Sequence, residues 1–159
     1  GTGTLNRVDT GRMIDGLREA LRRIEANLPI YSLTGTILDR SFFAQPHERP
    51  CGVGEAYLVI DQAGRIARCQ MALGEVVTDV TAEDPLAVLR QNEGWKNPSV
   101  DQKEGCKECQ WRYVCGGGCP LAAYRANGRY DAPSPYCEVY QTLLPEILRL
   151  EGLRLARSV

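Results

Sequence analysis

The sequence contains no long apolar run, little phenylalanine and a single histidine. No stretch approaches the roughly 18 apolar residues that cross a bilayer, and the N-terminus lacks a basic segment followed by an apolar one. The 19 basic and 20 acidic residues nearly cancel, and the arginine-rich stretches lack regularly interleaved aromatic residues, so nothing favours a polyanionic partner. We therefore expect a soluble, cytoplasmic protein that binds neither nucleic acid nor membrane.

Cysteine, in contrast, is abundant, with seven residues in 159. Four of them form the run Cys106-x2-Cys109-x5-Cys115-x3-Cys119. The glycines at 116–118 let the backbone reverse, so the run directs several thiolates towards one point, where a cation must offset their repulsion. An odd count without an export signal argues against a disulfide framework. Zinc is an alternative, but the five residues between Cys109 and Cys115 are fewer than zinc knuckles usually show.

The dipeptide Cys119-Pro120 indicates how the cysteines divide. In ferredoxins with two clusters a tight cysteine run ends in Cys-Pro, and the last cysteine ligates the other cluster. The same rule gives a four-cysteine set and a three-cysteine set here: Cys106, Cys109, Cys115 and Cys137, and Cys51, Cys69 and Cys119. The three-cysteine set is one ligand short, which predicts an open iron.

Local patterns predict an α+β fold. Apolar residues at helical spacing indicate an amphipathic helix from Asp9 to Leu28, capped by Asp9 or Thr10. Strands at 56–61 and 65–69, joined by a turn at 62–64, form a β-hairpin whose antiparallel pairing brings Cys51 and Cys69 together. The other predicted elements are a third strand at 74–81, a helix from Asp84-Pro85, helical turns at 121–126 and a helix at 138–155 that Pro145 kinks or restarts, with loops at 30–50 and 92–105.

The expected organisation is therefore a small β-hairpin followed by cysteine-rich cluster-binding loops and helices, flanked by an N-terminal and a C-terminal amphipathic helix. We divide the chain into an N-terminal helix at 1–29, a linker at 30–50, a cluster domain at 51–140 and a C-terminal helix at 141–159. The opening Gly1-Thr2-Gly3-Thr4 has no initiator methionine, which leads us to expect a piece of something longer.

The complete cysteine pattern resembles a known domain. The string is Cys51-x12-Gly64-x4-Cys69, then Cys106-x2-Cys109-x5-Cys115-x3-Cys119, then Cys137. It resembles the SPASM domain of radical S-adenosylmethionine enzymes, over about Cys51 to Cys137. The flanking segments Trp111-Arg112-Tyr113, Gly128-Arg129-Tyr130 and Leu150-Glu151-Gly152-Leu153-Arg154 are similar to the peptide-maturing branch that forms cyclophanes.

The resemblance implies two auxiliary 4Fe-4S clusters, divided between the same two cysteine sets. It implies a domain that serves electron transfer and substrate positioning in an enzyme crosslinking a ribosomally made peptide. The implied partners are the precursor peptide, a radical S-adenosylmethionine barrel of the same parent chain and an electron donor or acceptor protein. The helix at 1–29 is then either the last barrel helix or a cover on the hairpin. The alternative is a zinc-stabilised peptide-binding module without redox activity. A cluster protein that loses its iron and takes up zinc in an aerobic preparation would look like such a module.

Three features depart from the family pattern. No Cys-x3-Cys-x2-Cys motif occurs, so the chain alone should be inactive and S-adenosylmethionine would bind only through a missing barrel. Relatives with a fully ligated first cluster carry a further cysteine near Tyr57, and this chain has none there. The open iron would then need another ligand. His47 is a candidate for that ligand, and the alternative is that His47 only packs in a loop or at the surface. Sulfatase-maturing relatives carry an aspartate where Gln70 stands, and an amide cannot act as that base.

Overall fold

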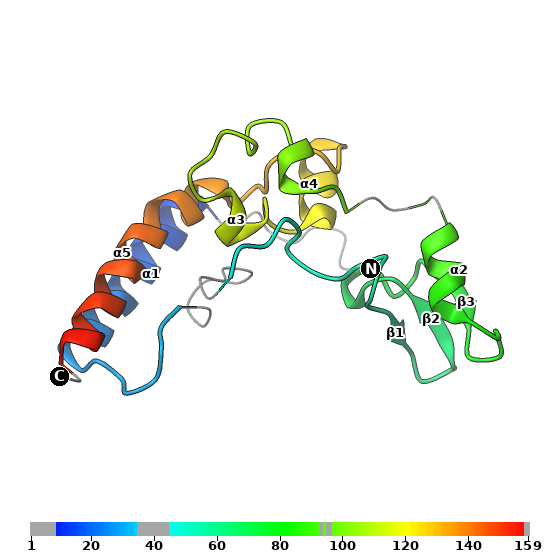
Figure 1. Ribbon diagram of the computed structural model, residues 1–159, viewed down its shortest axis with the longest axis horizontal. Helices are drawn as coiled ribbons and strands as arrows, with labels where there is room; N and C mark the ends of the chain where they lie inside the picture. The colour runs from blue at the N-terminus through cyan, green and yellow to red at the C-terminus, as the bar shows by residue number, and fades with distance from the viewer. Residues whose placement is uncertain (1–8, 35–44, 93, 95–96, 158–159) are drawn as a thin grey trace.

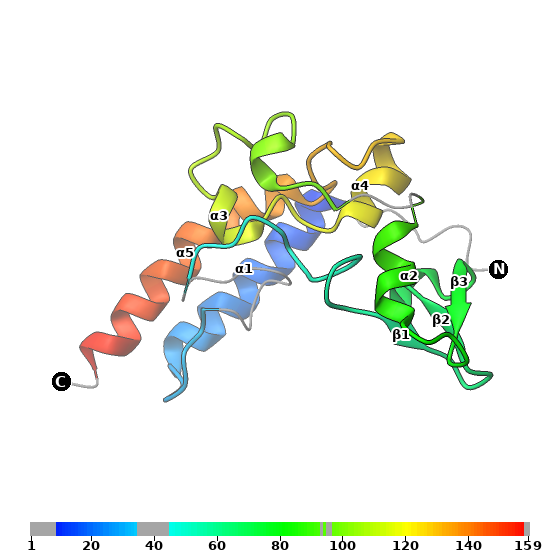
Figure 2. The same ribbon diagram turned by 45° about the vertical axis from the view of Figure 1, so that its right-hand side comes forward.

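The computed structural model describes residues 9–34, 45–92, 94 and 97–157. Its elements are α1 (Thr10–Ala26), β1 (Val59–Ile60), β2 (Arg65–Ala67), η1 (Gln70–Ala72), β3 (Val76–Asp79), α2 (Pro85–Gln91), η2 (Val100–Gln102), α3 (Arg112–Cys115), α4 (Pro120–Asn127) and α5 (Cys137–Ala156). Figure 1 and Figure 2 show a helix pair at one end, the sheet with α2 at the other, and the cysteine-bearing loops with α3 and α4 between them. The predicted α+β class is confirmed.

Helices α1 and α5 lie side by side and run in the same direction (Figure 2). The Asp9 carboxylate caps α1 by accepting the Gly11 N–H at 2.9 Å, as predicted. The apolar face of α1, with Ile14 and Leu21 buried, packs on the buried face of α5. Pro145 lies within α5 without ending it. Among the described residues, none of the helices has both the length and the apolar character needed to cross a bilayer.

The segment after α1 is held on α5 by Glu151. Its carboxylate accepts the Leu33 N–H at 2.9 Å and the Ser32 hydroxyl at 3.0 Å, and Arg154 Nη2 donates to it at 2.7 Å. Leu33 is thereby buried at 2% exposure, and Arg154 Nη1 also donates to the Ile30 carbonyl. The start of the predicted linker at 30–50 is therefore packed against the helix pair.

Replacing Glu151 by glutamine should destabilise the helix pair in a pH-dependent way. The hydrogen bond from Arg154, with those from Leu33 and Ser32, lowers the Glu151 pKa from 4.5 to about 2. Because the folded pKa is the lower one, the stabilisation is complete above pH about 4.5 and is lost as the pH falls through about 2. In the metal-free protein we expect Glu151→Gln to reduce the free energy of unfolding at pH 7 by on the order of 1–3 kcal/mol.

Urea unfolding followed by circular dichroism at pH 7 and at pH 3 measures this effect. Glu19→Gln is the control, because Glu19 pairs with Arg22 and Arg23 on the open face of α1 and is 48% exposed. It should change stability by no more than about 0.5 kcal/mol. A Glu151→Gln cost that is equal at the two pH values would contradict the expected linkage.

The three strands form an antiparallel sheet in the order β1-β2-β3, with Val59 opposite Ala67 and a bulge between Ile66 and Ala67. The third strand is confirmed, but β1 and β2 are shorter than predicted. Before β1 the chain forms a turn in which Ala56 N–H donates to the Gly52 carbonyl at 2.9 Å. After β2 the chain leaves the ladder, and η1 begins. Helix α2 covers the sheet and begins as predicted, with the Asp84 carboxylate accepting the Ala87 N–H at 3.0 Å.

Candidate metal centre

All four thiols of the four-cysteine set line one cavity. They come from separate segments: Cys106 and Cys109 from a turn, Cys115 from the end of α3 and Cys137 from the start of α5. The turn is closed by the Cys109 N–H, which donates to the Cys106 carbonyl at 2.8 Å. The rest of the lining is Trp111, Arg112, Gly117, Ser134, Tyr140 and Gln141. The fold thus brings Cys137 to the cysteine run from a position far along the chain.

Burial disfavours the charged form of three of these thiols, those of Cys106, Cys115 and Cys137. Desolvation raises the pKa of Cys106 to about 11, and the neighbouring Cys137 and Cys115 add to the shift. Burial also raises the pKa values of Cys115 and Cys137, and the nearby Cys109 adds to both shifts. The four groups therefore share one electrostatic environment, and a metal that binds there must displace their protons.

Backbone and side-chain N–H groups are directed at sulfur in both sets. The Trp111 N–H donates to Cys109 Sγ at 3.4 Å, and Gln141 Nε2 lies 3.9 Å from the same sulfur. The Met71 N–H donates to Cys69 Sγ at 3.4 Å. Hydrogen bonds to a thiolate favour its charged form and are one means by which proteins tune iron–sulfur clusters.

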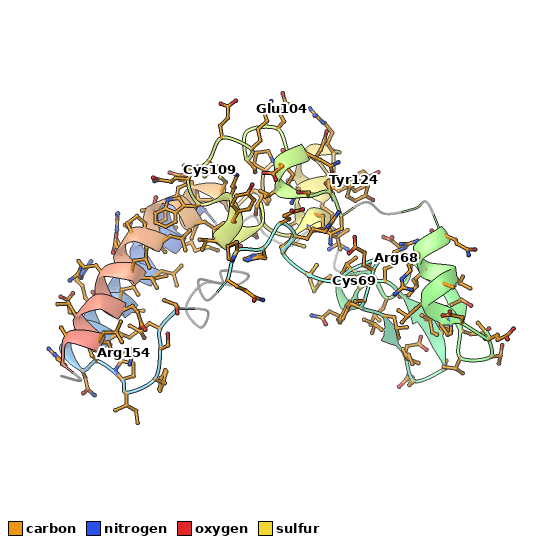
Figure 3. All side chains as sticks on the ribbon, in the orientation of Figure 1. Arg68, Cys69, Glu104, Cys109, Tyr124 and Arg154 are labelled. Atoms are coloured by element: carbon orange, nitrogen blue, oxygen red, sulfur yellow. The ribbon has the colours of Figure 1, made fainter. Side chains whose placement is uncertain are left out.

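The three-cysteine set gathers at a second place, nearer the sheet. Cys51, Cys69 and Cys119 belong to one apolar cluster, together with Val53, Tyr57, Ala72 and Leu121. Cys69 stands at the N-cap of η1 and Cys119 at that of α4. Figure 3 shows Cys69 beside the sheet and Cys109 beside α3 and α5. The two sets therefore lie in different parts of the fold.

Two neutral side chains form a hydrogen bond in this second group of residues. The Tyr57 hydroxyl donates to Gln70 Oε1 at 2.6 Å, and Tyr57, like Cys51 and Cys119, packs against the buried residues of this apolar cluster. Neither position supplies a thiol or a carboxylate. A neutral hydrogen-bonded pair thus stands beside the three thiols.

Three further polar side chains near the cysteines have identified contacts. The His47 N–H donates to the Tyr113 carbonyl at 3.0 Å, which places His47 beside α3. Arg129 pairs with Glu104 at 2.8 Å and with Asp131 at 3.0 Å, so carboxylates hold it. Arg112 lines the cavity of the four-cysteine set and donates to the Cys109 carbonyl at 3.2 Å.

The glycines at 116–118 all have positive φ angles, of 56°, 74° and 69°. Their carbonyls surround the ammonium of Lys103, a residue that is fully buried. Sequence reasoning missed Lys103, because a lysine three residues before a cysteine carries no distinctive signal. A Cβ at Gly117 would lie 2.5 Å from Lys103 Cδ, so the glycine lets the lysine side chain lie close against the backbone.

The donor set fits an iron–sulfur cluster. Within the described ranges no three His, Cys, Asp or Glu side chains lie close enough to hold a single ion, and each of the seven cysteines, all within those ranges, has a free thiol. The residues lining the cavity of the four-cysteine set offer sulfur and N–H donors, with no carboxylate or imidazole among them. Thiolate-only ligation with N–H donors to sulfur is typical of iron–sulfur clusters.

Comparison with known proteins gives one informative likeness. An uncharacterized protein of Archaeoglobus fulgidus is 31% identical to this chain over 114 residues, which is 70% of this chain. The chain spans 27% of the length of that relative. No protein-family model matches the chain, and no solved structure matches it. The relative has no described activity, so the likeness identifies a related sequence in a larger protein.

Proposed function

We propose that this chain is the auxiliary-cluster domain of a radical S-adenosylmethionine enzyme that crosslinks a ribosomally made peptide. The observation that carries the proposal is the convergence of Cys106, Cys109, Cys115 and Cys137 on one cavity. These are the four residues that the Cys-Pro rule and the SPASM resemblance assign to one cluster. These four cysteines would hold one 4Fe-4S cluster. A second cluster, with an open iron, would be held by Cys51, Cys69 and Cys119.

The chain's own residues prepare the first of these sites. A bound 4Fe-4S cluster supplies one-electron transfer at a potential that depends on charge, hydrogen bonds and solvent exposure. Trp111 and Tyr140 line the cavity of the four-cysteine set and reduce water access to it. The Trp111 N–H and Gln141 Nε2 are placed to donate hydrogen bonds to Cys109 Sγ, as they would to a cluster ligand. This environment supports a role in electron transfer.

The three-cysteine set supports a role in substrate positioning. It offers three thiols, with the neutral Tyr57–Gln70 pair packed beside them. A fourth ligand can then come from water, another side chain or an atom of the peptide. The absence of a carboxylate at Gln70 gives no support to the oxidation catalysed by sulfatase-maturing relatives.

The proposal requires partners beyond this chain. A barrel domain of the parent chain would bind S-adenosylmethionine, and an electron donor or acceptor protein would exchange electrons with the clusters. The Archaeoglobus fulgidus relative supports this arrangement, since the matching region is 27% of its length. We place the protein in a reducing compartment such as the cytoplasm, because the cysteines can ligate clusters only while they are not oxidised to disulfides.

Anaerobic reconstitution with iron and sulfide tests the proposal. We expect about eight irons per chain, with broad absorbance in the blue region of the spectrum, because seven thiolates would hold two four-iron clusters. A colourless protein that binds one or two zinc ions tightly and no iron would instead support the zinc-stabilised peptide-binding module. The zinc measurement must also be anaerobic, because oxidation destroys clusters and frees thiols for zinc.

A further inference from the structure

Lys103 is an unusual residue in this fold, because its side chain is completely buried. Its exposure is 0%, and it is the largest of the fully buried side chains. Lysine is almost never fully buried unless its charge is compensated, since the ammonium loses its hydration. The contacts of Lys103 should therefore show what compensates the buried ammonium.

The Lys103 ammonium has three hydrogen-bond donors and three neutral acceptors. Lys103 Nζ donates to the carbonyls of Gly116 at 3.3 Å, Gly117 at 3.3 Å and Gly118 at 3.2 Å. In the described part of the chain no carboxylate lies within ion-pair distance of Lys103. The carbonyls satisfy the N–H groups, but they leave a full positive charge inside the protein.

The position of that charge is the informative feature. The three glycines connect Cys115, which belongs to the four-cysteine set, to Cys119, which belongs to the three-cysteine set. Burial lowers the pKa of Lys103, and negative charge on sulfurs of both sets would oppose that effect: those of Cys106, Cys115, Cys119 and Cys51. The ammonium therefore lies where it interacts with both candidate centres.

We propose that Lys103 is a shared counter-charge for the two centres, which raises the reduction potential of both clusters. This inference rests on the proposed function, since it assumes that both sets hold clusters. Reduction adds one electron to a cluster and forms or breaks no bond, so the reduced form carries one more negative charge. A fixed cation stabilises that form more than the oxidised form, and a buried cation is little screened by water or salt.

The matched variants separate charge from hydrogen bonding. Lys103→Gln removes the charge and keeps N–H donors for the glycine carbonyls, whereas Lys103→Arg keeps the charge. Lys107→Gln is the control: it removes the same charge one residue from Cys106, at an exposed position. Each reconstituted protein is titrated with dithionite at controlled potential, and the reduced clusters are followed by electron paramagnetic resonance.

We expect Lys103→Gln to lower both midpoint potentials. The shift should be at least tenfold in the ratio of reduced to oxidised cluster at a fixed potential, or about 59 mV for a one-electron couple. Lys107→Gln should shift the ratio much less, because solvent screens its charge. Lys103→Arg should keep the wild-type potentials.

Iron-loaded Lys103→Gln with two clusters at wild-type potentials would overturn the inference, and so would a shift no larger than that of Lys107→Gln. If Lys103→Gln does not load iron, loading of Lys103→Arg at wild-type potentials supports the counter-charge, and failure of both variants overturns it. Failure of the wild-type protein itself to bind iron is a separate result, which removes the proposed function before any variant is compared.

Discussion

Replacing Cys119 by serine is expected to remove about half of the bound iron and to leave one four-iron cluster in place. Cys119 stands at the N-cap of α4 and packs with the apolar cluster that contains Cys51 and Cys69. Serine is smaller and a harder donor than a thiolate, so it holds iron–sulfur clusters poorly. Iron and sulfide analysis of the reconstituted protein, with Mössbauer spectroscopy to distinguish the clusters, measures the result.

Cys137→Ser is the reciprocal control, because Cys137 lines the cavity of the other set. It should also halve the iron, but the remaining cluster should be the one with an open iron and should differ in its spectra from the cluster that survives Cys119→Ser. Identical remaining spectra in the two variants would mean that both cysteines serve the same centre. The division of the cysteines would then be wrong.

Replacing Gly116 by alanine is expected to destabilise the protein by more than about 3 kcal/mol. Gly116 has a φ of 56°, and an added Cβ would lie 2.7 Å from Pro50 N and 2.9 Å from the Arg49 carbonyl carbon. Both atoms are backbone, so no side-chain rotation relieves the overlap. Gly116 follows Cys115 and Pro50 precedes Cys51, so the same overlap should also separate the two centres and reduce iron loading.

Gly152→Ala is the matched control for this substitution. Gly152 lies inside α5, and an added Cβ there meets no atom within 4 Å. Alanine in a helix interior should stabilise by about 0.5–1 kcal/mol. Thermal unfolding of the iron-loaded proteins compares the two changes. A Gly116→Ala protein with the wild-type melting temperature would show that the Arg49–Pro50 segment does not pack against this glycine.

The elements that the sequence predicts well are those with local signals. The apolar spacing and the Asp9 cap predict α1, and Asp84-Pro85 predicts the start of α2. The turn at 62–64 predicts the β1–β2 hairpin, whereas the strand lengths depend on where η1 begins, which no local pattern indicates. The bounds of a helix with strong apolar periodicity and a cap can be predicted from its own residues. The ends of a short strand depend instead on the residues that pack around it.

The candidate site also has features that the sequence predicts and features that it does not. Spacing and the Cys119-Pro120 dipeptide predict two cysteine sets, because ligand spacing is a property of the chain. The buried ammonium of Lys103 and the Tyr57–Gln70 hydrogen bond were not predicted. Both depend on tertiary contacts, and no local sequence pattern predicts which segments make those contacts. The buried cation and the residues packed beside the three-cysteine set could therefore be identified only in the structure.

Diffraction at the iron absorption edge, from anaerobically grown crystals of the reconstituted protein, locates the metal directly. The account predicts two separate groups of iron atoms, one within bonding distance of the sulfurs of residues 106, 109, 115 and 137, the other of those of residues 51, 69 and 119. A single group of iron atoms, or Cys119 Sγ bonded to the same group as Cys106 Sγ, would contradict it.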